Sequence, residues 1–211
     1  MGTSITSRSP SNHGRRSLPW FTLPWFTLGL GGLAALVFLG LEVFQSSLVF
    51  DREAIARGEF WRLVTGHVLH ISHGHFWLNV AAFFPLAWFS ERVLGHTRKF
   101  MVGTFLFSAM LINAWVWWAL PDIQFYAGLS AYLNTLYALV MLGAWERTRG
   151  PIFLLFLAGD GAKIAYEYFS DASLSGMTLD WHSLPSTHAV GLAAGIMIWF
   201  WGKVHNNVTP N

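Results

Sequence analysis

The sequence predicts an all-α, polytopic membrane protein, folded as a bundle of six transmembrane helices. Of its 211 residues, 54% are hydrophobic and only 11% are charged, whereas roughly a quarter of the residues of a soluble domain are charged. Crossing a bilayer takes about 20 apolar residues, and six segments approach that length. The expected spans are residues 22–45, 75–92, 100–119, 129–145, 151–169 and 188–203. The lipid bilayer is therefore the expected surrounding of most of the chain.

The predicted segments differ in composition, and the differences indicate their places in the bundle. The first is the longest and is rich in glycine, which suits close packing between membrane helices. The fourth and sixth are short and rich in small residues, as expected of helices surrounded by others. The connection over residues 45–74 mixes apolar side chains such as Phe60 and Trp61 with charges, which favours a structure lying in the membrane interface.

Basic residues predict the orientation of the bundle. With the amino terminus inside, the cytoplasmic ends collect Arg8, Arg15, Arg16, Arg92, Arg98, Lys99, Arg147, Arg149 and Lys203. This distribution follows the positive-inside rule. We therefore expect a disordered cytoplasmic tail over residues 1–21, a membrane domain over 22–204 and a cytoplasmic tail over 205–211. The net charge of +2 comes from few residues and implies no nucleic-acid partner.

Two of the predicted helices begin with side chains that can serve as a nucleophile and its base. Ser130 follows Gly128 at the start of the fourth helix, and His188 opens the sixth. A hydroxyl is a poor nucleophile until a base takes its proton, and histidine is the usual base. The predicted orientation places the starts of the second, fourth and sixth helices on the outer face, around one cavity. Gly191 and Gly195 have the spacing of close helix packing, so the sixth helix can approach the fourth.

Longer motifs surround these residues. The run from Glu59 to His70 reads Glu-Phe-Trp-Arg-Leu-Val-Thr-Gly-His-Val-Leu-His and leads into His75-Phe-Trp-Leu-Asn79. Together with Gly128-Leu129-Ser130 and the glycines after His188, they closely resemble the rhomboid intramembrane serine proteases over about residues 45–200. The resemblance implies a six-helix fold and cleavage of the transmembrane segments of membrane proteins.

The resemblance also implies a role for each site residue. Ser130 would be the nucleophile and His188 the general base, in a dyad that has no carboxylate. His75 and Asn79 lie one helical turn apart on one face, where they would donate hydrogen bonds to the oxyanion together with the Ser130 N–H. Trp61 and Arg62 match a structural feature of the family's first loop and take no part in the chemistry.

A narrower resemblance is to the rhombosortases, small bacterial rhomboids paired with proteins that carry a C-terminal Gly-Gly, transmembrane and basic sorting tail. It rests on the compact length, the run from Trp61 to His67, and Lys163-Ile164-Ala165-Tyr166-Glu167 in the fifth helix. The subgroup implies partners with a C-terminal transmembrane tail. It also implies a Gram-negative inner membrane, with both termini cytoplasmic and an active site that opens to the periplasm.

Two positions depart from the family's pattern. Ala131 stands where a glycine usually follows the nucleophile, and Asn134 stands where rhomboids often have tyrosine and rhombosortases often have histidine. We expect Asn134 one turn below Ser130 and near His188, where an amide can hydrogen-bond the imidazole but cannot stack on it. These departures support an alternative function, that of a catalytically inactive rhomboid relative that binds membrane proteins without cutting them.

The remaining polar residues leave further alternatives. Asp160, Lys163 and Glu167 lie on one face of the fifth helix, where ionisable groups are costly and usually paired or functional. Lys163 and Glu167 can form an i,i+4 ion pair, recognise the polar part of a substrate or line its lateral path. A transporter using these charges is a third interpretation, although no inverted repeat is visible. His70 and His73 have a ligand-like spacing, but no cysteine or acidic cluster completes a site. We expect no metal and no cofactor, and we expect His70 to bond within the first loop.

Overall fold

The computed structural model describes residues 23–40, 45–70, 72–170 and 184–208. Its long helices are α1 (Trp25–Gly40), α5 (His73–Arg92), α6 (Arg98–Ala119), α7 (Ser130–Thr148), α8 (Ile152–Ser170) and α9 (Pro185–Val208). The short elements are α2 (Gln45–Leu48), β1 (Phe50–Asp51), α3 (Arg52–Ala56), α4 (Arg62–Thr65) and β2 (Phe125–Tyr126). The fold is predominantly helical, as predicted. The predicted tail 1–21 and residues 209–211 of the other predicted tail lie outside the described residues.

Each long helix corresponds to one of the predicted segments, and the differences lie at the ends. Helix α5, the second predicted segment, begins at residue 73 because the Ser72 hydroxyl accepts a hydrogen bond from the His75 amide, 3.2 Å away, and so caps the helix. The sixth begins at Pro185, since proline is well suited to the first position of a helix. It continues to Val208, five residues beyond the predicted end.

Helix composition alone does not establish six membrane crossings. Among the described residues, α6 is the one helix that is both long and apolar enough to cross a membrane, and α1 contains a shorter apolar stretch, Trp25–Leu39. Other long helices carry polar side chains in their middle, such as Asn79 in α5 and Lys163 in α8. These groups lower the hydropathy of their helices and need partners inside the bundle.

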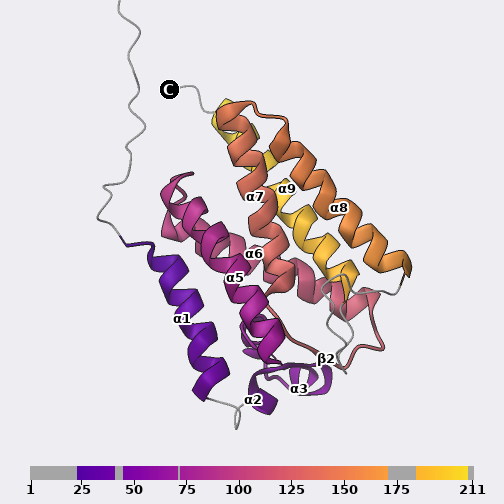
Figure 1. Ribbon diagram of the computed structural model, residues 1–211. Helices are drawn as coiled ribbons and strands as arrows, with labels where there is room; N and C mark the ends of the chain where they lie inside the picture. Colours follow the sequence, from indigo (N-terminus) through magenta and orange to yellow (C-terminus); the bar gives the residue numbers. More distant parts are fainter. Residues whose placement is uncertain (1–22, 41–44, 71, 171–183, 209–211) are drawn as a thin grey trace, which may run out of the picture.

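The fourth long helix, α7, lies at the centre of the bundle. It packs against α5, α6, α8 and α9, whereas α1 lies at one edge beside α5 (Figure 1). Its buried side chains join an aromatic core with α5 and α6 that includes Phe83, Phe105 and Tyr132. The first residue of this central helix is Ser130, so the nucleophile candidate lies where neighbouring helices can supply further groups.

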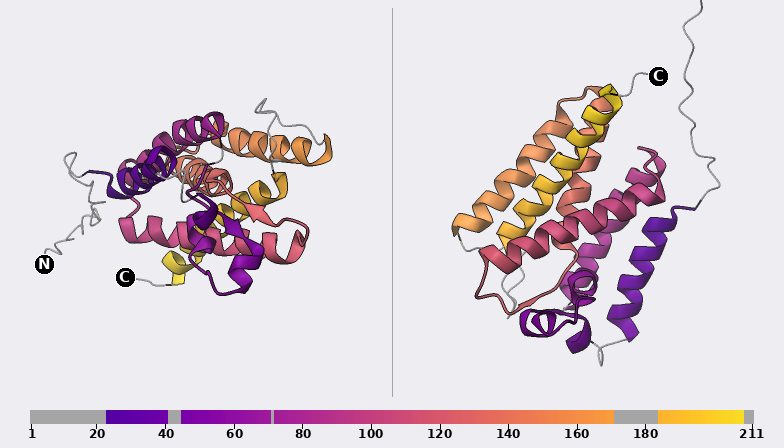
Figure 2. Two further views of the ribbon diagram at one scale, coloured as in Figure 1. Left: turned by 90° about the horizontal axis from the view of Figure 1, so that it is seen from below. Right: turned by 180° about the vertical axis from the view of Figure 1, so that it is seen from behind.

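Residues 45–70, between α1 and α5, form a compact cap beneath the bundle, at the end where α7 begins (Figure 2). Buried Arg62 holds it together: its guanidinium pairs with Glu59 at 2.8 Å and donates to the carbonyls of Ser46 and Val49. Strand β1 pairs antiparallel with β2, immediately before the Ser130 turn. The interfacial structure predicted for residues 45–74 is thus a small folded unit that contacts the segment leading to Ser130.

The edge helix α1 is attached through a buried carboxylate. Glu91, at the end of α5, accepts hydrogen bonds from the Phe26 and Thr27 amides at 3.1 and 2.8 Å, and from the Thr27 hydroxyl at 2.6 Å. The first amides of a helix have no carbonyl partner within it. Glu91 therefore caps α1 from a distant part of the chain.

Candidate active site

The turn before Ser130 depends on a glycine. Gly128 has a φ of +132°, a conformation that L side chains rarely adopt. Its amide donates to the Gly66 carbonyl at 2.9 Å, which joins the turn to the first loop. A Cβ at position 128 would also lie 2.8 Å from Cε1 of His75. The glycine thus lets the chain turn and lets a histidine from α5 approach.

Ser130 and His188 lie within hydrogen-bond distance. The Oγ of Ser130 is 3.0 Å from Nε2 of His188, although the two residues are 58 positions apart in the sequence. Both are half-buried. Nδ1 of the imidazole is buried and has no hydrogen-bond partner among the described residues. The pair therefore has the geometry of a serine and its base, with no third group bonded to the histidine.

Close packing of α9 on α7 brings these two residues together. A Cβ at Gly191 would collide with the carbonyl group of Ala131, and one at Gly195 would lie 2.5 Å from the Thr135 carbonyl oxygen. The hydroxyl of Thr135 donates to the Gly191 carbonyl at 2.8 Å and bonds Ser108 of α6 at 2.7 Å. The sequence analysis missed Thr135, a buried residue five positions after Ser130. Its hydroxyl links α6, α7 and α9.

His75 of α5 lies beside the turn that leads into the central helix, and Asn79 lies one turn further along α5. The ring of His75 lies against Gly128: a Cβ there would be 3.3 Å from its Nε2 and 3.8 Å from Oγ of Ser130. Asn79 is only 5% exposed, and its Nδ2 is buried without a partner among the described residues. A buried amide N–H that lacks a protein partner is a donor available to another group.

Asn134 bonds the backbone of the serine. Its Nδ2 donates to the Ser130 carbonyl at 2.8 Å, one turn away. The sequence predicts this amide one turn below Ser130 and near His188, where it can hydrogen-bond the imidazole. In the structure, its N–H donates to the Ser130 carbonyl. An asparagine side chain is short enough to bond its own helix in this way, which a tyrosine ring would not do.

The charged face of α8 contains an ion pair near the candidate base. Nζ of Lys163 is 2.9 Å from Oε2 of Glu167, and the glutamate side chain is only 3% exposed, against 42% for the lysine. The predicted i,i+4 pair is therefore present. Lys163 and Glu167 also lie close enough to His188 for their charges to act on its imidazole. This position is compatible with contact between the pair and a substrate, the alternative role that the sequence analysis gave it.

The loop histidines bond groups of the first loop and of α6. His70 bonds the Val68 carbonyl at 3.2 Å, within the first loop as predicted, and its ring lies 5.3 Å from that of His75. His67 bonds Asn113 of α6 at 3.2 Å. Burial lowers the pKa of both His67 and His70 to about 4, so both are neutral at pH 7. Across the described ranges, no three His, Asp or Glu side chains gather as a metal site would require.

Comparison with known proteins identifies the family. A model of the Rhomboid domain matches residues 57–203, which include α4 to most of α9 and all the site residues described above. No curated protein matches the chain. The matched region covers well over half of the sequence. The chain therefore belongs to the rhomboid family, whose members are integral membrane proteins and generally intramembrane serine proteases.

Proposed function

We propose that this rhomboid protein is an active intramembrane serine endopeptidase that uses Ser130 as nucleophile and His188 as general base. The observation that carries the proposal is the 3.0 Å distance between Oγ of Ser130 and Nε2 of His188, inside a Rhomboid domain. A hydroxyl and an imidazole at this separation form the pair that activates serine in many unrelated hydrolases.

The proposed reaction runs through an acyl-enzyme. Nε2 of His188 takes the proton of Ser130 as its Oγ attacks the scissile carbonyl carbon, and a tetrahedral oxyanion forms. When the C–N bond breaks, the imidazolium returns the proton to the leaving amine. Water then attacks the ester while His188 takes its proton, and the imidazolium returns that proton to Oγ of Ser130 as the C–O bond breaks and the acid product leaves. This cycle needs the tautomer of His188 that carries its proton on Nδ1.

Three donors are proposed for the oxyanion. The Ser130 N–H belongs to the first turn of α7 and has no carbonyl partner within that helix. The ring of His75 lies beside Gly128, and Asn79, one turn further along α5, has a buried Nδ2 with no partner among the described residues. The amino-terminal end of α7 adds the positive end of a helix dipole. Removing one such donor commonly lowers the rate by a factor of about 100 to 1,000.

The proposed topology is that of six membrane spans with both termini in the cytoplasm. The positive-inside distribution of arginine and lysine supports it, and it opens the site to the periplasm of a Gram-negative inner membrane. We further propose substrates of the rhombosortase type, in which a Gly-Gly sequence precedes a transmembrane tail. Glycine eases the unwinding that exposes a scissile bond, and the Lys163–Glu167 pair beside His188 is suited to contact the polar part of such a tail.

The test is cleavage of a Gly-Gly-tailed membrane reporter in cells that express the chain. We expect the wild type to release the reporter, and Ser130→Ala and His188→Ala to abolish release. Ser186→Ala is the matched control, because Ser186 lies in the first turn of α9, two residues from His188, and should leave release intact. Release that survives both dyad substitutions would refute the proposed mechanism.

A fluorophosphonate probe tests activation of the serine without a substrate. We expect labelling of the wild type and of Ser186→Ala, and none of Ser130→Ala. A wild type that stays unlabelled and releases no reporter would favour the alternative function, an inactive relative that binds membrane proteins. Labelling without release would instead uphold the dyad and reject the Gly-Gly substrate.

A further inference from the structure

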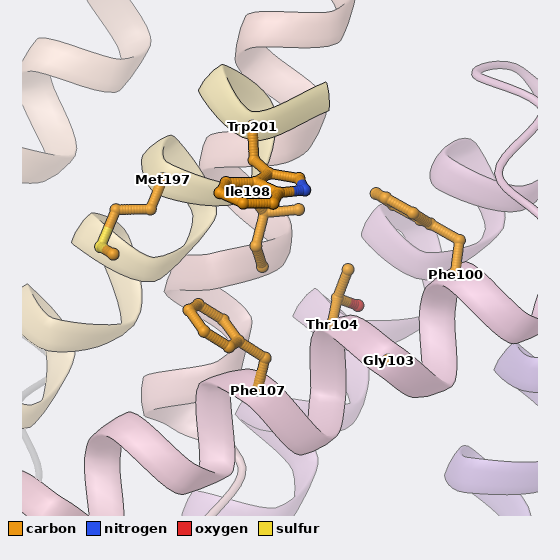
Figure 3. Close-up of a pocket in the computed structure, with 7 residues that line it drawn as sticks. All are labelled: Phe100, Gly103, Thr104, Phe107, Met197, Ile198 and Trp201. Carbon is orange, nitrogen blue, oxygen red and sulfur yellow. The ribbon is translucent and has the colours of Figure 1, made fainter. Parts of the chain in front are cut away.

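An apolar groove separates α6 from α9 at the end of the bundle opposite Ser130. Figure 3 shows side chains of the two helices pointing toward each other across it. The groove has a volume of about 550 Å³. It is lined by Phe100, Gly103, Thr104, Phe107, Met197, Ile198 and Trp201. The hydroxyl of Thr104 donates to the Met101 carbonyl at 2.8 Å, so its proton is not available to a ligand.

A second cavity, of about 530 Å³, adjoins this groove and is more polar. The two share Phe100 and Ile198 as lining residues. The second also contains Arg147 and Arg149 from the end of α7 and Lys203 from α9. The two adjoining cavities, one apolar and one cationic, are together called the composite cavity.

Positive charge dominates the cationic part. Glu146 is its one carboxylate among the described residues, and it is already engaged by the Lys203 ammonium and by Nε1 of Trp199. The Arg147 guanidinium donates to the Leu94 carbonyl at 2.8 Å, which leaves further N–H groups for another acceptor. The guanidinium of Arg149 lies over the ring of Trp145.

The histidine in this cavity adds no charge at neutral pH. His96 lies in the turn between α5 and α6, and Nδ1 of its ring bonds the Ser90 hydroxyl at 2.7 Å. Burial, reinforced by the nearby guanidinium of Arg147, lowers the pKa of His96 to about 4. With three cations against one carboxylate, the cavity is suited to an anion of one or two charges.

We propose that the composite cavity binds an anionic phospholipid, with its phosphate held by Arg147, Arg149 and Lys203 and its acyl chains in the groove between α6 and α9. A lipid fits because the charged and apolar surfaces adjoin: a free anion would leave the groove unfilled, and a neutral hydrocarbon would leave the excess positive charge without an anion. Basic pockets between membrane helices bind anionic headgroups for this reason. The proposal is independent of proteolytic activity.

Two glycines, Gly103 and Gly202, can be substituted without steric conflict at the Cβ, so side chains placed there test the proposal directly. No atom lies within 4 Å of a Cβ built at Gly103, in the apolar groove, or at Gly202, in the cationic part. Gly202→Glu adds a negative charge beside the proposed phosphate, and Gly202→Lys adds a side chain of similar length with the opposite charge. Gly103→Trp fills the groove without altering charge.

Binding is measured by native mass spectrometry of the full chain in detergent, titrated with phosphatidylglycerol or phosphatidylethanolamine of identical acyl chains. We expect phosphatidylglycerol to bind at least about fivefold more tightly, since one charge near a headgroup has an effect of that size. Gly202→Glu should weaken its binding by about fivefold or more, whereas Gly202→Lys should not weaken it. Arg149→Gln should weaken it about fivefold, and Arg98→Gln, an exposed cation outside the cavity, should not.

Filling the apolar groove distinguishes a lipid site from a site for free anions. If the site binds a lipid, Gly103→Trp should weaken phosphatidylglycerol binding and leave any binding of inorganic phosphate unchanged. Equal affinity for the two lipids, or equal effects of Gly202→Glu and Gly202→Lys, would overturn the proposal. So would displacement of phosphatidylglycerol by millimolar inorganic phosphate. Circular dichroism of each variant establishes that its helices are intact, and Arg149→Gln supplies the test should a glycine variant fail to fold.

Discussion

The glycines that follow His188 determine how closely α9 approaches α7, and a methyl group there perturbs the candidate dyad without changing either member. A Cβ at Gly195 would lie 2.5 Å from the Thr135 carbonyl oxygen and 2.7 Å from the Cβ of Ala138. Ordinary van der Waals contact begins at 3.4 Å. Gly195→Ala therefore requires a displacement of about 0.9 Å between the helices.

A displacement of this size is enough to break the candidate dyad. The distance between Oγ of Ser130 and Nε2 of His188 is 3.0 Å, and about 0.9 Å more takes it beyond the range of a hydrogen bond. Misplacing a reacting group by about 1 Å can lower a rate about 100-fold. Overpacking of this kind also lowers the free energy of unfolding by about 1–3 kcal/mol. Gly191→Ala should act more strongly, because its methyl meets the backbone of Ala131.

The assay is the rate of fluorophosphonate labelling of Ser130 in detergent, with the thermal midpoint measured on the same samples. We expect labelling of Gly195→Ala to be about 100-fold slower than that of the wild type. Gly202→Ala is the matched control, since it lies on the same helix and its Cβ meets no atom within 4 Å. Wild-type labelling of a folded Gly195→Ala protein would refute the argument that helix packing positions the base.

Three further predictions concern other described residues. His75→Ala and Asn79→Ala should each lower the rate of reporter cleavage by a factor of about 100 to 1,000, measured at saturating reporter expression; a loss of reporter binding instead would contradict the oxyanion role. Glu91→Gln should lower the free energy of unfolding by about 1–3 kcal/mol, because it removes the charge that caps α1, and an unchanged thermal midpoint would exclude that role. His67 has a folded-state pKa of about 4 against 6.5 for the free side chain, so the unfolded chain binds more protons between these values. Its contribution to stability should be complete above pH 6.5 and decline toward pH 4, and His67→Gln should make the thermal midpoint less dependent on pH in that window than it is in the wild type.

Local signals in the sequence were sufficient to predict the long helices. The apolar segments were long and separated by charged or glycine-containing turns, so each corresponds to one long helix. Ends were less predictable, because they depend on single capping contacts such as that of Ser72 with the His75 amide. The ion pair of Lys163 and Glu167 was predictable too, since i,i+4 residues are neighbours on any helix.

Contacts between distant parts of the chain could not be predicted in the same way. Membrane helices are apolar on most of their surface, so periodicity gives little indication of which face meets which neighbour. Nothing local distinguishes Thr135 from other threonines, yet its hydroxyl joins α6, α7 and α9. Glu91 was likewise invisible as a cap, because its partners lie more than 60 residues earlier.

The packing of α9 positions the imidazole of His188, since Asn134 bonds the Ser130 carbonyl. In a serine triad, a carboxylate bonded to the histidine holds the ring in its tautomer and orientation. Among the described residues, nothing bonds Nδ1 of His188, and the Asn134 amide donates to the Ser130 carbonyl. In the part of the chain that the structure describes, the ring is held by its bond to Ser130 and by the position of its helix. The close packing of Gly191 and Gly195 on α7 determines that position. In this chain the two glycines therefore help to place the histidine, as the carboxylate does in a triad.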